Sequence, residues 1–233
     1  MKIAIMQPYF MPYLGYFQLI DAVDQFVVYD EIQYSKQGWI NRNRILQNGK
    51  DAFISLPLKK ASDYLFVKQR FLADSWQRDR EKMLNRLACC YRKAPYFADA
   101  YGLIENILYC QENNLFDFIF NSITLVLAHL GITTPLVISS SLTEVQALKA
   151  EQKIFEICRQ LGAKHYINPI GGVALYDKKN FSGQGLSLSF LQTDSIRYRQ
   201  FGHDFLAHLS IIDVLMFNSP QEIRDLLPCY RLQ

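Results

Sequence analysis

The first thirty residues contain two short, almost wholly apolar runs separated by one amphipathic stretch. Residues 2–6 and 25–29 are the apolar runs, and residues 13–23 between them place apolar side chains at helical spacing. Such continuous apolar runs are typical of strands buried on both faces, as in parallel sheets. A strand, a helix and a second strand form a βαβ unit, whose crossover is right-handed. The start of the chain therefore predicts a parallel sheet covered by helices.

The next stretch has a different pattern. Asn48-Gly49 lies between two further runs, residues 39–46 and 52–58, and this dipeptide is a strong hairpin signal. Residues 65–71 are predicted to form a third strand beside the hairpin. We therefore expect a small antiparallel excursion after the first βαβ unit.

An α/β pattern then returns after three amphipathic helices. Pro95 suits the first turn of the second of these helices, and Gly131 suits the end of the third. The predicted helices span 76–91, 96–109, 115–130, 148–161 and two stretches within 206–227, and the later strands span 136–139, 164–167 and 186–191. We expect an α/β fold with a Rossmann-like parallel sheet, forming a single domain over 1–233 with a helical insertion over about 74–131.

Composition narrows the function classes. The chain has 233 residues, 50% of them hydrophobic, and a formal charge of only +3, which does not favour a nucleic-acid partner. No apolar run approaches the roughly 20 residues of a membrane span. The five cysteines are odd in number and form no CxxC pair, so we interpret them as reduced thiols of a cytoplasmic protein.

Polar and aromatic side chains follow three of the predicted strands. Gln7 and Tyr9 come after the first strand, Asp30 after the second, and Asn168 after the strand at 164–167. Ligands of open parallel sheets bind beyond the carboxyl ends of the strands. If these strands are neighbours, their ends should line one pocket for a planar or sugar-like small molecule.

Glycines near these ends allow two interpretations each. Gly15 lies in the first helix, where glycine costs about 1 kcal/mol relative to alanine. Either a ligand approaches it, with free helical N–H groups for a phosphate, or it relieves crowding between helix and sheet. Gly171-Gly172 either makes a tight turn or lets backbone amides contact an anion. Tyr176 and Asp177 follow that pair.

Residues 38–44 form a second unusual segment. Strand alternation would place Trp39 and Asn41 on one face, as a surface for a sugar or base, and Arg42 on the other. Arg42 could clamp a carboxylate or phosphate with two parallel bonds. The alternative is a solvated hairpin with Trp39 folded onto the core. Arg197, in a basic aromatic stretch, could reach a phosphate or lie in an exposed loop.

Standard nucleotide and hydrolase motifs are absent: the chain carries no Walker A loop, no G-x-G-x-x-G, no H-E-x-x-H and no G-x-S-x-G. The sequence does not indicate which cofactor, if any, the protein binds, and it shows no spacing typical of metal ligands.

Long segments resemble the WbqC-like protein family: "MQPYFMPYLGYFQLIDAVDQFVVYDEIQYSKQGWINRNRI", "YINPIGGVALYDKKNF" and "HLSIIDVL". The resemblance implies a role in bacterial O-antigen synthesis, in which an amino acid such as glycine is transferred onto a nucleotide-linked or lipid-linked sugar. Under it, the expected roles are a base at Asp30, a pocket shaped by Gly15, Tyr16 and Gln18, an anion held by Asn41 and Arg42, and a far wall of Asn168, Gly172, Tyr176 and Asp177.

The opening βαβ unit is also similar in layout to pantothenate synthetases and other HIGH-motif nucleotidyltransferases. Tyr13-Leu14-Gly15-Tyr16 stands where those enzymes have a His-x-Gly-His element that holds ATP phosphates. Both histidines are replaced by tyrosine, which can donate a hydrogen bond but carries no positive charge. Two alternatives to the transferase therefore stay open: an ATP-dependent nucleotidyltransferase or ligase, and a non-catalytic nucleotide-sugar-binding protein.

Overall fold

The centre of the molecule is a mixed, mostly parallel β-sheet. A computed structural model describes residues 1–143, 145, 148, 150–202 and 204–233. Across these residues the sheet has the strand order β5-β2-β1-β6-β7-β8, and only β8 runs antiparallel to its neighbour. The strands are β1 (Lys2–Met6), β2 (Gln25–Val28), β5 (Leu136–Ile138), β6 (His165–Pro169), β7 (Ser187–Thr193) and β8 (Tyr230–Leu232). The predicted α/β fold with a Rossmann-like parallel sheet is confirmed.

The three strands whose ends are polar are neighbours. β1 lies between β2 and β6, with Met6 opposite Val28 and Ile3 opposite Tyr166. From β1 the chain first builds outward through β2 and β5, and later adds β6 and β7 on the other side. The direction of strand addition therefore reverses between β1 and β6. Such a switch point is where open α/β sheets leave a crevice at the carboxyl ends of their strands.

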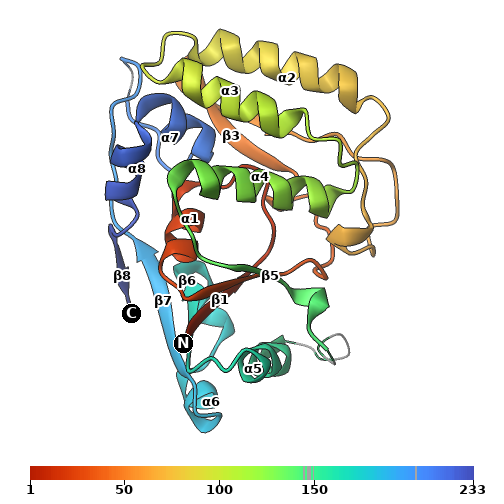
Figure 1. The fold of residues 1–233 in the computed structure, drawn as a ribbon, viewed down its shortest axis with the longest axis vertical. Helices are drawn as coiled ribbons and strands as arrows, with labels where there is room; N and C mark the ends of the chain where they lie inside the picture. The colour runs from red at the N-terminus through yellow and green to blue at the C-terminus, as the bar shows by residue number, and fades with distance from the viewer. Residues whose placement is uncertain (144, 146–147, 149, 203) are drawn as a thin grey trace.

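Helices cover both faces of the sheet, as Figure 1 shows. The helices are α1 (Leu14–Asp21), α2 (Trp76–Tyr91), α3 (Phe97–Leu108), α4 (Leu115–Leu130), α5 (Ala150–Gln160), α6 (Lys178–Gly183), α7 (Ile211–Phe217) and α8 (Pro220–Leu226). Strand alternation feeds two cores, because successive side chains point to opposite faces. Ala4 joins the larger core with α1, α4 and α7, whereas Ile3 and Ile5 join the smaller core with α5 and α6.

The predicted hairpin forms β3 (Arg42–Gln47) and β4 (Lys50–Ser55). Asn48 and Gly49 have φ angles of 52° and 75°, the left-handed backbone that a tight hairpin turn requires. The third strand at 65–71 is wrong. That segment contains a 3₁₀ turn, η1 (Val67–Gln69), because its backbone groups bond to separate segments: the Val67 N–H donates to the Ile32 carbonyl, and the Phe71 carbonyl accepts from the Lys59 N–H.

Other boundaries also differ from the sequence predictions. Pro95 precedes Tyr96, the N-cap of α3, so it lies outside the first turn. Residues 206–210 are not helical, and β8, α6 and two further 3₁₀ turns, η2 (Ser139–Ser141) and η3 (Ile170–Leu175), were not predicted. The predicted helix at 148–161 is observed as α5, and its residue 149 lies outside the described residues.

Helices α2, α3 and α4 lie together beyond one face of the sheet, between β4 and β5 in the sequence (Figure 1). This is the range of the predicted insertion, and its side chains belong to the same large core as α1 and α7. The division into one domain with an insertion stays a prediction. Within the described part of the chain, no helix is long and apolar enough to cross a membrane.

Candidate functional site

A cavity of about 490 Å³ opens at the carboxyl ends of β1, β2 and β6. We call it the β1–β6 pocket. It is lined by six of the residues that the sequence singles out: Gln7, Tyr9, Asn168, Gly171, Gly172 and Tyr176. The strand-end segments that carry these residues come together because β1 and β6 are adjacent and parallel. Helix α5 closes the pocket from the side of the smaller core.

The wall contributed by β6 depends on Gly172. A Cβ atom at this position would lie 1.8 Å from Nδ2 of Asn168 and 3.5 Å from the Tyr176 ring. Only a glycine lets the Asn168 amide occupy this place. The Tyr166 hydroxyl donates to Oδ1 of Asn168 over 3.2 Å, which fixes the orientation of the amide. Asn168 is therefore a positioned polar group in a mainly aromatic wall.

The opposite wall holds a buried lysine that the sequence reasoning missed. Lys153 of α5 lines the pocket with only 8% of its side chain exposed. Its ammonium group donates to the Tyr29 hydroxyl and to Oε2 of Glu31, each over 3.3 Å. One signal was present in the sequence. Lys153 falls on the same helical face as Ile154 and Ile157, and a lysine on an apolar face is almost never buried without a partner.

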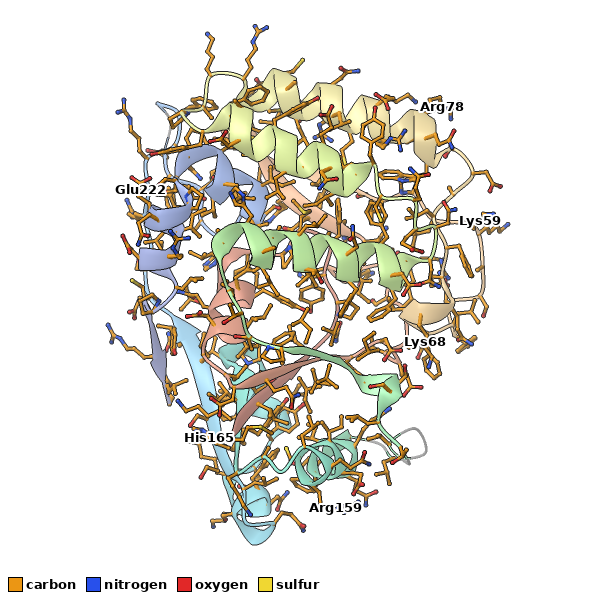
Figure 2. All side chains as sticks on the ribbon, in the orientation of Figure 1. Lys59, Lys68, Arg78, Arg159, His165 and Glu222 are labelled. Atoms are coloured by element: carbon orange, nitrogen blue, oxygen red, sulfur yellow. The ribbon has the colours of Figure 1, made fainter. Side chains whose placement is uncertain are left out.

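Behind Lys153 the charges continue through the buried carboxylates Glu31 and Asp30 to Lys68, whose side chain is 33% exposed. Oε1 of Glu31 accepts from Lys68 over 2.8 Å, and the Lys68 ammonium lies 3.8 Å from Oδ2 of Asp30. Figure 2 shows Lys68 near the carboxyl ends of the strands, whereas His165 lies at the opposite end of the sheet. Two lysines and two carboxylates balance in charge, and Lys153 is the member that lines the pocket.

Asp30, Tyr16 and Gln18 do not line this pocket. Asp30 is 2% exposed, and its Oδ1 accepts from the Ser139 hydroxyl and the Ser140 amide over 2.7 Å and 3.0 Å. The predicted role as a base does not fit this geometry, because Asp30 ties β2 to the turn η2 instead of facing a ligand.

The two predicted residues on α1 are also part of the core. Tyr16 is 1% exposed and donates its hydroxyl to the Gln7 carbonyl over 2.9 Å. Gln18 is fully buried and donates to the carbonyls of Leu226 and Cys229 over 2.9 Å and 3.0 Å. Their places on the buried face of α1 make them structural groups: Tyr16 holds the strand-end backbone, and Gln18 anchors the end of α8.

Gly15 is explained by close packing. A Cβ there would lie 2.4 Å from the Tyr13 ring and 2.7 Å from Oγ1 of Thr193. Of the two interpretations of this glycine, crowding between the start of α1 and the end of β7 is therefore present in the structure. Gly15 and the exposed Arg197 line a separate cavity of about 400 Å³, not the β1–β6 pocket.

In the segment that leads into the hairpin, two predicted side chains are hydrogen-bonded within the protein and one faces a cavity. Asn41 accepts from the Tyr34 hydroxyl and donates to the Leu56 carbonyl, each over 2.9 Å. Arg42 donates to the carbonyls of residues 38 and 37 over 3.0 Å and 2.6 Å, so its fork already holds the entry to the hairpin. Trp39, in contrast, is 38% exposed and lines a third cavity of about 460 Å³.

Asp177 also lies outside the β1–β6 pocket. Its side chain caps helix α6 by accepting from the Lys179 amide over 2.9 Å. Burial keeps three tyrosine hydroxyls of the pocket itself neutral. Burial raises the pKa of Tyr9 and of Tyr176, and raises that of Tyr166 well above its ordinary value. These tyrosines therefore act as hydrogen-bonding groups and apolar surfaces, not as phenolates.

The fold and the pocket define a Rossmann-like α/β protein with a cavity at the switch point of its sheet. The chain belongs to the WbqC-like protein family, whose model matches residues 7–225. It is also 30% identical over 238 residues to a protein of Mycobacterium tuberculosis (strain ATCC 25618 / H37Rv) named "Uncharacterized protein Rv1507c", and the match covers 97% of each chain.

Proposed function

We propose that the protein is a cytoplasmic transferase of bacterial surface-polysaccharide (O-antigen) synthesis that binds a sugar in the β1–β6 pocket and transfers an amino acid, such as glycine, onto it. The observation that carries this proposal is the composition of the pocket at the switch point. Tyrosine rings line it together with a buried lysine and a positioned amide.

This composition suits a sugar better than a wholly apolar or a strongly charged ligand. A sugar ring has apolar C–H faces, which pack on aromatic rings such as Tyr9 and Tyr176. Its hydroxyls need donors and acceptors in fixed places, and the Asn168 amide and the Tyr29 hydroxyl are of this kind. Lys153 would bind an anionic or hydroxyl oxygen of the substrate while it keeps its contact with Glu31.

The chemistry requires an activated amino acid. An amide forms when the amine nitrogen of an amino sugar attacks the acyl carbon, and the carrier leaves as an alcohol, thiol or phosphate. A free carboxylate has no such leaving group, so the donor must be an ester, a thioester or an acyl phosphate. The nitrogen loses one proton in this step, and we assign no residue to accept it, because Asp30 and Glu31 are both engaged in buried contacts.

The experiment has two stages. Nucleotide sugars, amino-sugar phosphates and glycine are first screened by thermal shift, since a ligand at about 100 times its dissociation constant raises the stability of the fold by about 2.7 kcal/mol. Each binding sugar is then incubated with an activated glycine ester, and the product is weighed by mass spectrometry. The matched pair of variants is Asn168→Ala, in the pocket, and Asn180→Ala, at an exposed position of helix α6.

The transferase predicts a glycyl-sugar product whose formation is slowed by Asn168→Ala and not by Asn180→Ala. Binding without any product would leave the sugar-binding protein as the better description and would overturn the transferase. Release of pyrophosphate from ATP with the same substrates would instead favour the ligase alternative.

A further inference from the structure

The third cavity, which we call the hairpin-side cavity, adjoins the β1–β6 pocket. The two share Tyr9, and consecutive residues divide between them, with Pro169 lining the pocket and Ile170 lining the hairpin-side cavity. Their volumes are similar, at about 490 Å³ and 460 Å³. A single extended ligand that passes Tyr9 would therefore reach both.

The hairpin-side cavity offers a flat ring and a positive charge. Trp39 is 38% exposed there, and its ring stacks against Phe53 with 28° between the planes. The Arg44 guanidinium lies 5.5 Å from the centre of the Trp39 ring and also lines the cavity. Among the described residues that form this lining, none is acidic. The Asp51 carboxylate, outside the lining, pairs with Arg44 over 3.1 Å with 46% of its side chain exposed.

The hairpin fixes both groups in place. Asn43, between Arg42 and Arg44 on β3, is 5% exposed and donates to the carbonyls of Phe10 and Met11 over 3.2 Å and 2.9 Å. These bonds attach the hairpin to the segment that follows Tyr9. The aromatic surface and the arginine therefore hold a set position relative to the shared residue.

We propose that the hairpin-side cavity binds the nucleoside diphosphate part of a nucleotide sugar, with the base on Trp39 and the phosphates near Arg44, and that the sugar passes Tyr9 into the β1–β6 pocket. An aromatic face accepts any base by stacking, and a guanidinium binds phosphate oxygens through paired N–H groups. The placement of the sugar rests on the proposed function, and it selects a nucleotide-linked over a lipid-linked substrate. The placement of the nucleotide stands on this cavity alone.

The test uses calorimetric titration with ADP, GDP, UDP and CDP, and then with sugar derivatives of whichever nucleotide binds. Trp39→Ala should weaken the free nucleotide about tenfold, and Trp39→Phe should restore most of the loss, because stacking needs a ring. Tyr64→Ala removes an aromatic side chain that is 84% exposed and lies outside the cavity lining, so it should leave the affinity unchanged. Arg44→Gln should weaken binding more than Arg42→Gln, because Arg44 lines the cavity and Arg42 does not.

A separate comparison of affinities tests whether one ligand occupies both cavities. Lys153→Met should reduce the affinity for the nucleotide sugar and leave that for the free nucleotide unchanged, because only the sugar reaches the pocket. Equal losses for both ligands would place them in one cavity and overturn the arrangement. Failure of all four nucleotides to bind, or equal affinities for Trp39→Ala and Tyr64→Ala, would overturn the nucleotide site.

The two proposals fail separately. Tryptophan-dependent nucleotide binding without transfer would keep the nucleotide site and contradict the transferase. Transfer onto a lipid-linked sugar, with no nucleotide bound, would do the reverse.

Discussion

The protein buries carboxylates in two clusters, and the groups that stabilise the carboxylates differ between them. The first is the Lys153–Glu31–Lys68–Asp30 chain beside the β1–β6 pocket, in which the carboxylates face two lysines. The second is centred on Asp213 of α7, which is fully buried and accepts from three neutral groups. Tyr91 donates to its Oδ1 over 2.9 Å, and Tyr198 and Gln200 donate to its Oδ2 over 2.7 Å each.

This difference indicates that the first cluster belongs to a binding site, whereas the Asp213 cluster is structural. The donors around Asp213 come from the end of α2 and from the segment before α7, so this carboxylate ties three parts of the chain together. None of its four members lines the β1–β6 pocket. In the first cluster one lysine opens onto that pocket and can exchange contacts with a ligand. We therefore expect mutations of the two clusters to separate stability from binding.

The largest effect should come from Asp213→Ala. The substitution leaves two tyrosine hydroxyls and one amide without their acceptor, and each unpaired buried group costs about 1–3 kcal/mol. We expect the free energy of unfolding to fall by about 3 kcal/mol or more, measured by urea denaturation. Asp225→Ala, on the exposed face of α8, is the control and should change stability little. Similar small changes in the free energy of unfolding for the two variants would show that the Asp213 cluster does not stabilise the fold.

A second comparison lies within the first cluster. Lys153 and Lys68 both bind Glu31, but only Lys153 lines the pocket. Lys153→Met and Lys68→Met should each lower stability by about 1–2 kcal/mol, because Glu31 keeps one lysine in either variant. Only Lys153→Met should weaken the binding of a nucleotide sugar, by about tenfold or more, since hydrogen bonds to charged groups contribute about 1.5–3 kcal/mol. Equal binding losses, measured by calorimetry, would remove the distinction between the two lysines.

The smallest effect is a dependence on pH that belongs to the second cluster. Burial outweighs the three donors and raises the pKa of Asp213 above its ordinary value of 3.8. A folded-state pKa above the unfolded one gives stability that is complete below the unfolded pKa and is lost as pH rises through the folded pKa. The stability of the protein relative to Asp213→Asn should therefore be greatest in acid and decline as pH rises above about 4. Urea denaturation across this range measures it, and a constant or rising difference would contradict the raised pKa.

Much of the fold could be predicted from the sequence, because its strongest signals are local. The apolar runs gave the parallel strands, and Asn48-Gly49 gave the hairpin turn, where both residues adopt the left-handed backbone. The segment at 65–71 was predicted wrongly because strand formation requires one partner along its length, and here the partners are separate segments. The residues of the segment carry no information about that.

The site could be predicted only in part. Strand-end position identified Tyr9 and Asn168, which line the pocket. It equally suggested Asp30, whose environment is set by η2, a turn more than a hundred residues later in the chain. The apolar helical face around Lys153 indicated burial, but its partners Glu31 and Tyr29 lie more than a hundred residues earlier in the chain, and no local pattern identifies them. Local sequence thus predicts which strand ends are polar, and tertiary packing decides which of their side chains face the pocket.

A crystal structure of the protein with its tightest-binding nucleotide sugar is the most direct test of both proposed sites. We expect the sugar in the β1–β6 pocket, in contact with Lys153 and Asn168, and the diphosphate on the other side of Tyr9, near Arg44. A ligand bound away from the carboxyl ends of β1 and β6, with Lys153 still engaged only by Glu31 and Tyr29, would contradict this expectation.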